Sequence, residues 1–286
     1  MAHFRKYHGL GNDYLVIDPM DISFEPTPEA VRIICDRHHG VGSDGILLGP
    51  LVQEGGPTLR IFNPDGSQAE KSGNGLRIFS WYLHERGYIS DPEFPLLTQG
   101  GPVRAWIIDP LEKRIRIDMG TPSFDAQTAA PGAGCAEILD REFDFTGELC
   151  RIGFVSMGNP HCVVLGKAVS EGLARRLGPL VEHSSLFPAR TNVQFLEVLG
   201  PSEIRIEIWE RGAGYTLASG SSSCAAAAVA RRLGLVAGDE IVVRMPGGVL
   251  DVRFEGGTAL LTGPVEKVFE GVFSEDLLAK IRSAGG

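Results

Sequence analysis

Two stretches of this chain repeat one pattern, and the distance between them constrains the fold more than any other feature. Ser72 is followed by Gly-Asn-Gly and an apolar run, and Ser219 is followed by Gly-Ser-Ser and an alanine-rich run. Each stretch combines glycine-rich turn chemistry with the start of a helix, so free backbone N–H groups should point at one spot. The serines are 147 positions apart in 286 residues. This spacing predicts two similar lobes related by a pseudo-twofold axis.

The predicted fold class is α+β, with each lobe a mixed, curled sheet around a central helix. Both motif helices are apolar on nearly all sides and must therefore be enclosed. We expect an N-terminal lobe over residues 1–120, a C-terminal lobe over 121–265, and a segment 266–286 that packs back on the N-terminal lobe. The composition of residues 121–150, rich in proline, glycine, alanine and aspartate, predicts a connection with weak structure.

Hydrophobic periodicity predicts a series of strands and helices that starts again in the second half of the chain. The expected strands are 14–18, 45–48, 58–62, 103–108, 114–119, 151–156, 162–165, 192–198, 203–209, 240–244 and 259–262. The expected helices are 29–36, 74–85, 168–177 and 222–233.

Composition excludes several classes of partner. The formal net charge is −9, which argues against nucleic acid, because phosphates require a basic face. No apolar run approaches the roughly 18 residues of a membrane span, and the start of the chain has no signal-like apolar block. We therefore expect a cytoplasmic protein without a membrane partner. The five cysteines show no CxxC pairing, which favours free thiols over a disulfide framework or a metal site.

Six segments, in order along nearly the whole chain, resemble the diaminopimelate epimerase family. They are residues 8–18, 35–45, 60–75, 157–164, 190–195 and 210–227. Six spaced motifs that agree together are far more specific than a lone glycine fingerprint. The resemblance implies a homodimeric isomerase of lysine and cell-wall biosynthesis that needs no cofactor and no metal. It implies inversion of an α-carbon by two cysteines, one a thiolate base and the other a thiol acid.

Ser72 and Ser219 stand where the resemblance implies those two cysteines. A free cysteine ionises near pH 8.5, and a helix N-terminus lowers that pKa further. A serine hydroxyl is a usable base only when a neighbouring group takes its proton. Because the loss of one acid or base costs roughly 10²–10⁴ in rate, the departure bears directly on catalysis. It leaves the predicted fold unchanged.

The residues that the resemblance implies for substrate binding are all present. Arg211 would clamp the distal carboxylate of diaminopimelate as a bidentate fork, and Glu210 would accept from the distal ammonium. The implied catalytic positions are Ser72, Ser219, His161 and Glu210, with His161 orienting or deprotonating a catalytic group. The implied substrate-binding positions are Asn12, Asn63, Gly73, Asn74, Asn159, Asn192, Glu210, Arg211, Gly220 and Ser221.

Several of these residues have a structural interpretation as well. Asn12 and Asn63 lie in sequences typical of turns, where asparagine supplies turn chemistry. His161 can cap a strand end instead of acting in catalysis. Glu210 and Arg211 can form a solvated charge pair, although their place before the second motif favours a ligand role.

Residues beside the motifs carry further hypotheses. Cys224 lies more than one turn into the second helix, which favours a small buried side chain. Lys71 is expected to face solvent, with a role as base as the alternative. Tyr215 replaces an acidic residue that is usual in the family. The pair at positions 38 and 39, both histidines, has no carboxylate or thiol companions at metal-ligand spacing and is expected to be structural.

Three functions remain open at this stage. The first is an epimerase or racemase of diaminopimelate or a close amino acid, with serines that work through neighbours. The second is a non-catalytic binder that keeps the amino-acid pocket, and the third is a different isomerase or dehydratase on the same scaffold. A laboratory double replacement of cysteine by serine is a further alternative, but nearby departures, Ser222 among them, favour natural divergence.

Overall fold

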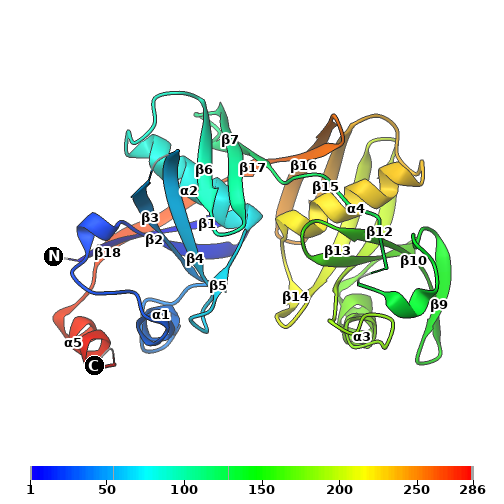
Figure 1. Ribbon diagram of the computed structural model, residues 1–286, viewed down its shortest axis with the longest axis horizontal. Helices are drawn as coiled ribbons and strands as arrows, with labels where there is room; N and C mark the ends of the chain where they lie inside the picture. Colours follow the sequence, from blue (N-terminus) through cyan, green and yellow to red (C-terminus); the bar gives the residue numbers. More distant parts are fainter. Residues whose placement is uncertain (1, 54, 128, 285–286) are drawn as a thin grey trace. The chain divides into compact units, whose positions relative to one another are not determined.

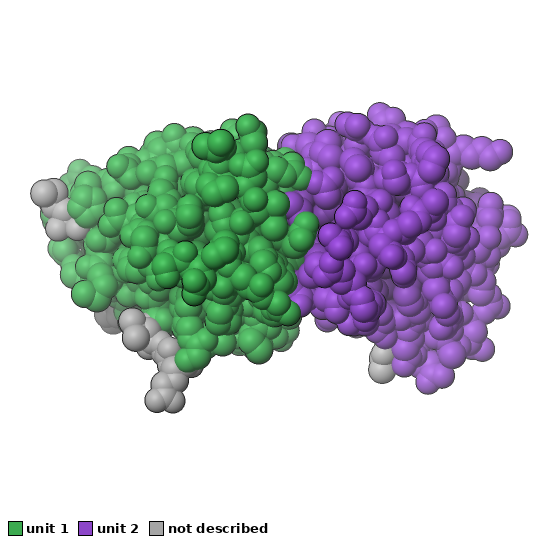
Figure 2. All heavy atoms as spheres, turned by 90° about the horizontal axis from the view of Figure 1, so that it is seen from above, with its two compact units in different colours: residues 1–117, 263–286 green, residues 118–262 purple. Residues whose placement is uncertain are grey.

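The computed structural model describes residues 2–53, 55–127 and 129–284, and the chain divides into two units (Figures 1 and 2). Unit 1 comprises residues 1–117 and 263–286, and unit 2 comprises residues 118–262. Each unit is a mixed sheet with one helix enclosed by its strands, so the predicted α+β class is confirmed.

The sheet of unit 1 contains both antiparallel and parallel strand pairs. Strand β1 pairs antiparallel with β18 and β2, β2 pairs parallel with β3, and β3 pairs antiparallel with β4. Strand β4 pairs antiparallel with β5 and parallel with β6, and β6, β7 and β8 continue antiparallel. The strands are β1 (His3–Gly9), β2 (Asn12–Ile17), β3 (Ile46–Gln53), β4 (Gly56–Phe62), β5 (Gln68–Ala69), β6 (Glu93–Thr98), β7 (Gly101–Asp109), β8 (Arg114–Asp118) and β18 (Glu266–Val272). The helices are η1 (Pro19–Asp21), α1 (Pro28–Cys35), α2 (Gly73–Glu85) and α5 (Glu275–Ala284).

Unit 2 repeats this order of elements and directions. Strand β10 pairs antiparallel with β9 and β11, β11 parallel with β12, and β12 antiparallel with β13. Strand β13 pairs antiparallel with β14 and parallel with β15, and β15, β16 and β17 continue antiparallel. The strands are β9 (Arg141–Phe145), β10 (Glu148–Ser156), β11 (Pro160–Gly166), β12 (Asn192–Gly200), β13 (Glu203–Glu210), β14 (Gly214–Thr216), β15 (Glu240–Met245), β16 (Gly248–Glu255) and β17 (Thr258–Pro264). The helices are η2 (Pro131–Ala133), α3 (Glu171–Glu182) and α4 (Gly220–Arg232).

The offset of 147 residues between the two serines extends through most of both units. Ile46 pairs with Phe62 between β3 and β4, and Val193 pairs with Trp209 between β12 and β13, each 147 positions later. Strands β6 and β15 begin 147 positions apart, as do β7 and β16. Helices α2 and α4 both begin and end at that offset. The prediction of two similar lobes is therefore confirmed at the level of single residues.

The two central helices bury side chains of different size. Helix α2 buries large side chains such as Phe79 and Tyr82, whereas α4 buries a run of alanines. Small residues on α4 let neighbouring strands approach closely, and a Cβ placed on Gly153 of β10 would lie 2.6 Å from Cγ1 of Val229. Figure 1 shows each helix alongside the strands of its own unit.

The structure corrects the expectation of weak structure over residues 121–150. This segment contains η2 and strand β9, and Ala126, Ala130, Ile138 and Phe145 are buried in the apolar core of unit 2. Proline, glycine and aspartate hid these contacts, because the apolar residues between them are too widely spaced to show a period.

Several elements also differ from the predicted boundaries. Helix α3 begins after Ser170, whose Oγ accepts from the Leu173 N–H at 3.2 Å, and it continues past Gly178 and through Pro179. The expected helix at 168–177 was therefore placed too early and ended too soon. Strands β1, β5, β6, β9, β14, β16 and β18 and helices η1, η2 and α5 were not predicted. In unit 1, Leu278 and Ile281 of α5 share a core with α1.

Candidate functional site

The N-terminus of α2 is organised by Ser72. The Ser72 Oγ accepts a hydrogen bond from the Gly75 N–H at 3.1 Å, and its carbonyl accepts from the Leu76 N–H at 2.8 Å. The backbone is extended at this cap, with φ −143° and ψ 116°. An N-cap serine satisfies only one of the orphan N–H groups of a helix, so those of Gly73 and Asn74 point outward without an intrahelical acceptor.

The N-terminus of α4 has the same construction. The Ser219 Oγ accepts from the Ser222 N–H at 3.5 Å, and its carbonyl accepts from the Ser223 N–H at 3.1 Å. The cap has φ −146° and ψ 126°, close to the values at Ser72. Gly220 and Ser221 occupy the positions whose N–H groups lack an intrahelical acceptor. Each unit therefore presents one serine hydroxyl at one anion-binding helix end.

A chain of side-chain hydrogen bonds holds the first turn of α2. The Asn12 Nδ2 donates to Asp44 Oδ2 at 3.0 Å, and the Asn74 Nδ2 donates to Asn12 Oδ1 at 3.0 Å. Arg77 is fully buried and donates through Nη2 to Asn74 Oδ1 at 2.8 Å and through Nη1 to the Gly73 carbonyl at 3.2 Å. Asn12 and Asn74 are thus brought together, and both amide groups are engaged in fixing the helix end.

Charged residues surround this chain. Asp13 receives ion-pair contacts from Lys6 at 2.7 Å and from Arg37 at 2.6 Å, and Arg37 also reaches Asp44 at 2.7 Å. Burial by itself would raise the pKa of Asp13, but hydrogen bonds from Arg37 and Lys6 outweigh it and hold that pKa below its ordinary value. The Asp13 carboxylate therefore stays ionised and anchors the strand that carries Asn12.

Tyr14 is a residue that the sequence interpretation missed. Its hydroxyl lies 3.1 Å from the Ser72 Oγ, and its ring is almost wholly buried. Gly45 provides the space for the ring, because a Cβ at that position would lie 2.7 Å from Tyr14 Cε1. The signal that could have found it is the internal offset, since Tyr14 lies 147 positions before His161.

In unit 2, Asn192 connects two predicted parts of the site. Its Oδ1 accepts from the Arg211 N–H at 3.0 Å, and its Nδ2 donates to the Pro160 carbonyl at 3.0 Å. The Asn159 Oδ1 and the His161 Nε2 are 2.9 Å apart. The structure therefore brings these residues together around the ends of β11, β12 and β13.

His161 has no exposed surface. Its pKa is lowered to about 3, mainly by burial; a hydrogen bond with Gln194 opposes the shift, and the nearby charge of Arg211 contributes to it. A neutral imidazole can accept or donate one hydrogen bond at each nitrogen, but it resists taking a proton in this environment. With a pKa this low, His161 is neutral at neutral pH.

The turn that carries Glu210 and Arg211 rests on a buried carboxylate. The Glu182 Oε1 accepts from the Gly212 N–H at 3.0 Å, and its Oε2 accepts from the Trp209 Nε1 at 2.7 Å. Arg211 is exposed and donates through Nη1 to the Ala189 carbonyl at 3.3 Å. Sequence reasoning missed Glu182, because a glutamate on a helix that is polar on one face carries no distinguishing signal.

Asn63 lies apart from the chain around Ser72. Its Nδ2 donates to the Ser67 Oγ at 2.9 Å, and its backbone N–H donates to the Ser67 carbonyl at 2.8 Å. These bonds fix the turn after β4. Asn63 occupies the position of Glu210 under the internal offset of 147, so it lies at the corresponding end of the corresponding strand.

Four further hypotheses concern residues beside the motifs. Lys71 is exposed and Cys224 is fully buried, as expected. Burial and a 2.7 Å hydrogen bond to Glu207 raise the pKa of Tyr215, so its hydroxyl is held as a donor in unit 2. Both histidines at positions 38 and 39 are exposed, and their backbone N–H groups donate to Asp36 Oδ1. Within the described part of the chain, no group of three or more potential ligands could hold a metal ion.

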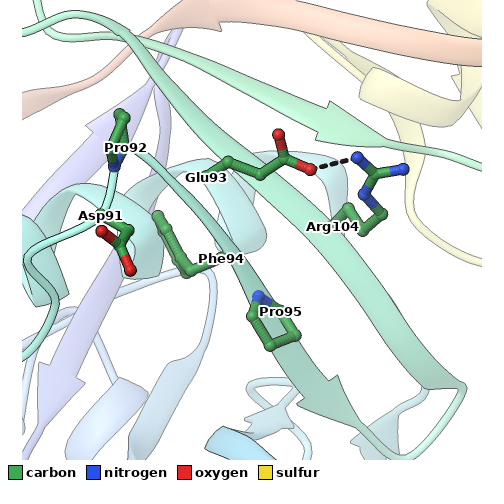
Figure 3. A pocket seen from close by; sticks show the side chains of 6 residues that line it. All are labelled: Asp91, Pro92, Glu93, Phe94, Pro95 and Arg104. Carbon is green, nitrogen blue, oxygen red and sulfur yellow. Dashed lines mark hydrogen bonds and ion pairs between the residues drawn. The ribbon is translucent and has the colours of Figure 1, made fainter.

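Unit 1 also has a surface hollow of about 590 Å³. Figure 3 shows its lining, with Glu93 and Arg104 joined by an ion pair across β6 and β7. The six lining residues are Asp91, Pro92, Glu93, Phe94, Pro95 and Arg104, and none is a predicted site residue. Within the described ranges, no helix has the length and apolar character needed to cross a membrane.

Known structures place the fold in a class. A hydroxyproline epimerase from Agrobacterium vitis superposes with a TM-score of 0.68 at 17% identity, over 94% of this chain and 91% of that one. At this identity the likeness concerns the fold alone. The two proteins therefore share a fold.

Sequence comparison narrows the class to one family. The diaminopimelate epimerase family model matches residues 4–124 and 153–268. Diaminopimelate epimerase 2 of Nostoc sp. is 48% identical over 96% of this chain and 97% of its own length. Diaminopimelate epimerase of Moorella thermoacetica is 38% identical over 96% of this chain and 100% of its own length. The chain belongs to the diaminopimelate epimerase family.

Proposed function

We propose that this protein inverts the α-carbon of diaminopimelate or a close amino acid, as a cofactor-independent isomerase of the diaminopimelate epimerase type. The observation that carries the proposal is the pair of equivalent helix ends, each with a capping serine and two N–H groups without an intrahelical acceptor. Membership of the family, whose curated relatives carry the name diaminopimelate epimerase, supports the substrate class.

In this proposal the N–H groups at the helix ends act as donors to the reacting α-carboxylate, a role that family membership implies. The N–H groups of Gly73 and Asn74 and those of Gly220 and Ser221 neutralise the charge that grows on the carboxylate when the α-proton leaves. That charge builds up only as the bond to hydrogen breaks, so the donors favour the transition state over the bound substrate. Ser72 and Ser219 are the two acid–base groups that the proposal assigns to the reaction.

The distal end of the substrate is assigned to unit 2. Arg211 binds the distal carboxylate through its fork of N–H donors, and Glu210 accepts from the distal ammonium. Asn192 and Glu182 hold the backbone of this turn, which supports a fixed position for the clamp. Asn12, Asn63 and Asn159 complete the proposed substrate-binding set.

The roles proposed for the remaining catalytic residues follow from their burial and protonation. His161 orients Asn159 and the end of β11 and stays neutral at neutral pH. Glu210 is half-buried and precedes Ser219 by nine positions in the sequence. It is the carboxylate proposed to assist proton transfer at Ser219.

The test is proton NMR of the purified protein with LL-diaminopimelate in D₂O, combined with isothermal titration calorimetry. Loss of the α-proton signal and appearance of the meso isomer are the expected results. Binding without any loss of the α-proton signal would favour a non-catalytic binder with the same pocket. Absence of binding at millimolar ligand would contradict the proposed substrate class.

We also propose a cytoplasmic homodimer. All five cysteines are free thiols, which supports a reducing compartment. Strand β18 exposes apolar side chains in Val268, Phe269 and Val272, and such a stripe supports contact with a second copy. Light scattering after size-exclusion chromatography should give the mass of two chains, and Val268→Lys should shift it toward one.

A further inference from the structure

The hydroxyl of Ser72 is shared between two neighbours. Its oxygen accepts the Gly75 N–H at 3.1 Å, and the Tyr14 hydroxyl lies 3.1 Å from the same oxygen. A serine hydroxyl carries one proton and two acceptor lone pairs. Since Gly75 uses one lone pair, the Tyr14 hydroxyl is in place either to donate to Ser72 or to receive its proton.

The position of Tyr14 in the duplicated fold gives independent support. Tyr14 lies on β2 and His161 lies on β11, 147 residues apart, which is the offset of Ser72 and Ser219. In both units the neighbouring parallel strand is in the same register, because Leu15 pairs with Ile46 and Cys162 pairs with Val193. Tyr14 therefore occupies, beside the first serine, the position that His161 occupies in the second unit.

The local packing fits a fixed tyrosine at this position. Only 7% of Tyr14 is exposed, and its ring lies against the Cα of Gly45. The residue equivalent to Gly45 in unit 2 is Asn192. The larger ring of Tyr14 therefore lies beside a glycine, whereas the smaller ring of His161 lies beside an asparagine. The Tyr14 ring is therefore packed against the residue that precedes strand β3.

We propose that Tyr14 is a positioning residue that exchanges a proton with Ser72 and so makes the Ser72 hydroxyl an effective acid–base group. The inference rests on the proposed function and adds a residue to it. When Ser72 gives its proton to the α-carbanion, the Tyr14 hydroxyl replaces that proton and becomes a phenolate. In the opposite direction the Cα–H bond breaks, its electron pair stays on the substrate as the carbanion, Ser72 takes the proton, and the phenolate receives the proton that Ser72 gives up.

The choice of a phenol has a chemical reason. A phenol ionises near pH 10, far below the pKa of an aliphatic alcohol, so it can hold the charge that a serine alone cannot. A thiol at position 72 ionises by itself and needs no such partner. The dependence on Tyr14 should therefore disappear when the serine is replaced by cysteine.

The experiment compares Tyr14→Phe in two backgrounds by α-proton exchange in D₂O. In the native background we expect exchange to fall on the order of 10²-fold, the usual contribution of one proton-transfer group. In the Ser72→Cys background the same change should cost less than about 3-fold, because a thiolate forms without the phenol. The rise of the exchange rate with pH in the native protein should flatten in Tyr14→Phe.

Tyr82→Phe is the matched control. Tyr82 is also buried in unit 1, and its hydroxyl donates to Asp18 Oδ2 at 3.0 Å, so this variant loses a buried hydrogen bond away from Ser72. It should change thermal stability without changing exchange or its pH profile. The pH profile of the unaltered protein provides a measurement that does not depend on whether Tyr14→Phe folds.

The outcomes separate this inference from the proposed function. If exchange and its pH profile in Tyr14→Phe equal those of the native protein, the role of Tyr14 is refuted and the epimerase proposal stands. An equal penalty in the serine and cysteine backgrounds, or native exchange independent of pH, would refute it as well. If the native protein is inert but Ser72→Cys with Ser219→Cys is active, the serine relay is wrong although the function class holds. If neither protein exchanges the α-proton, both proposals fail.

Discussion

Replacement of both capping serines by cysteine should lower the free energy of unfolding and raise the rate of epimerisation. Each serine oxygen accepts one N–H at its helix end, from Gly75 at 3.1 Å and from Ser222 at 3.5 Å. A cysteine caps poorly, and loss of a serine cap costs about 1 kcal/mol, so the free energy of unfolding should fall by up to about 2 kcal/mol for the pair. The shorter bond at Ser72 predicts the larger share there.

The gain in activity follows from the same helix ends. A thiol pKa near 8.5 falls by about one unit when a partly buried helix N-terminus stabilises the anion by about 1.4 kcal/mol. Roughly half of the thiol is then ionised near pH 7.5, whereas a serine is essentially un-ionised. Because one acid–base group contributes about 10²–10⁴ in rate, Ser72→Cys with Ser219→Cys should raise epimerisation by at least 10².

The assay is proton NMR in D₂O starting from LL-diaminopimelate, with thermal unfolding measured on the same samples. Each single variant should gain much less than the pair, because inversion needs an acid on one face and a base on the other. A Ser222→Cys variant, one turn beyond Ser219, controls for the mere presence of a thiol. Unchanged activity in a double variant that still binds ligand would refute the reasoning and would favour a different isomerisation or an elimination.

Three further predictions follow from the site. Arg211→Ala should weaken diaminopimelate binding in calorimetry by about 1.5–3 kcal/mol, and Lys71→Ala should change it little, since only Arg211 is proposed to form a charge-assisted fork; equal losses would contradict the clamp. His161→Gln should remove a pH dependence of the free energy of unfolding. The native His161 pKa of about 3 is below the unfolded value near 6.5, so the unfolded state binds more protons between these two pH values. The stability of the native protein should therefore fall on acidification in that range, by up to about 1.4 kcal/mol per pH unit. If the free energies of unfolding of the native protein and the variant change in parallel with pH below 6.5, this contribution of His161 is excluded. Glu182→Gln should raise KM more than it lowers kcat, because the amide can still accept one of the two hydrogen bonds under the clamp turn.

The duplicated architecture could be predicted from two serines alone. Glycine-rich turns before apolar helices have a strong local signature. When both halves of a chain have the same order of elements, the offset between two such turns also relates the other elements of the two halves. The offset holds for both helix ends too, since Gly87 and Gly234 follow α2 and α4 in left-handed conformations 147 positions apart. Internal symmetry therefore carried more information than the period of any single strand.

The contacts that complete the site could not be predicted in the same way. Arg77 binds partners only three and four residues earlier on its own helix, the Asn74 side chain and the Gly73 carbonyl, but the fold was needed to show that its guanidinium is fully buried. Glu182 differs, because its two acceptors meet donors about 30 residues away in the chain. Side chains that act through long-range hydrogen bonds leave no local pattern, so their roles appear only with the tertiary structure.

The two units surround their equivalent helix ends with different side chains. Leu47 in unit 1 faces Gly75, where a Cβ would lie 3.0 Å from the Leu47 Cδ2, whereas the equivalent Gln194 donates to the Ser222 Oγ at 3.0 Å. The first serine thus has an apolar wall and a phenol beside it, and the second has a buried amide and hydroxyl behind its helix end. Inversion requires a proton to leave one face of the α-carbon while another arrives at the opposite face, so identical surroundings are not needed. The proposed function therefore assigns unequal proton partners to two equivalent helix ends.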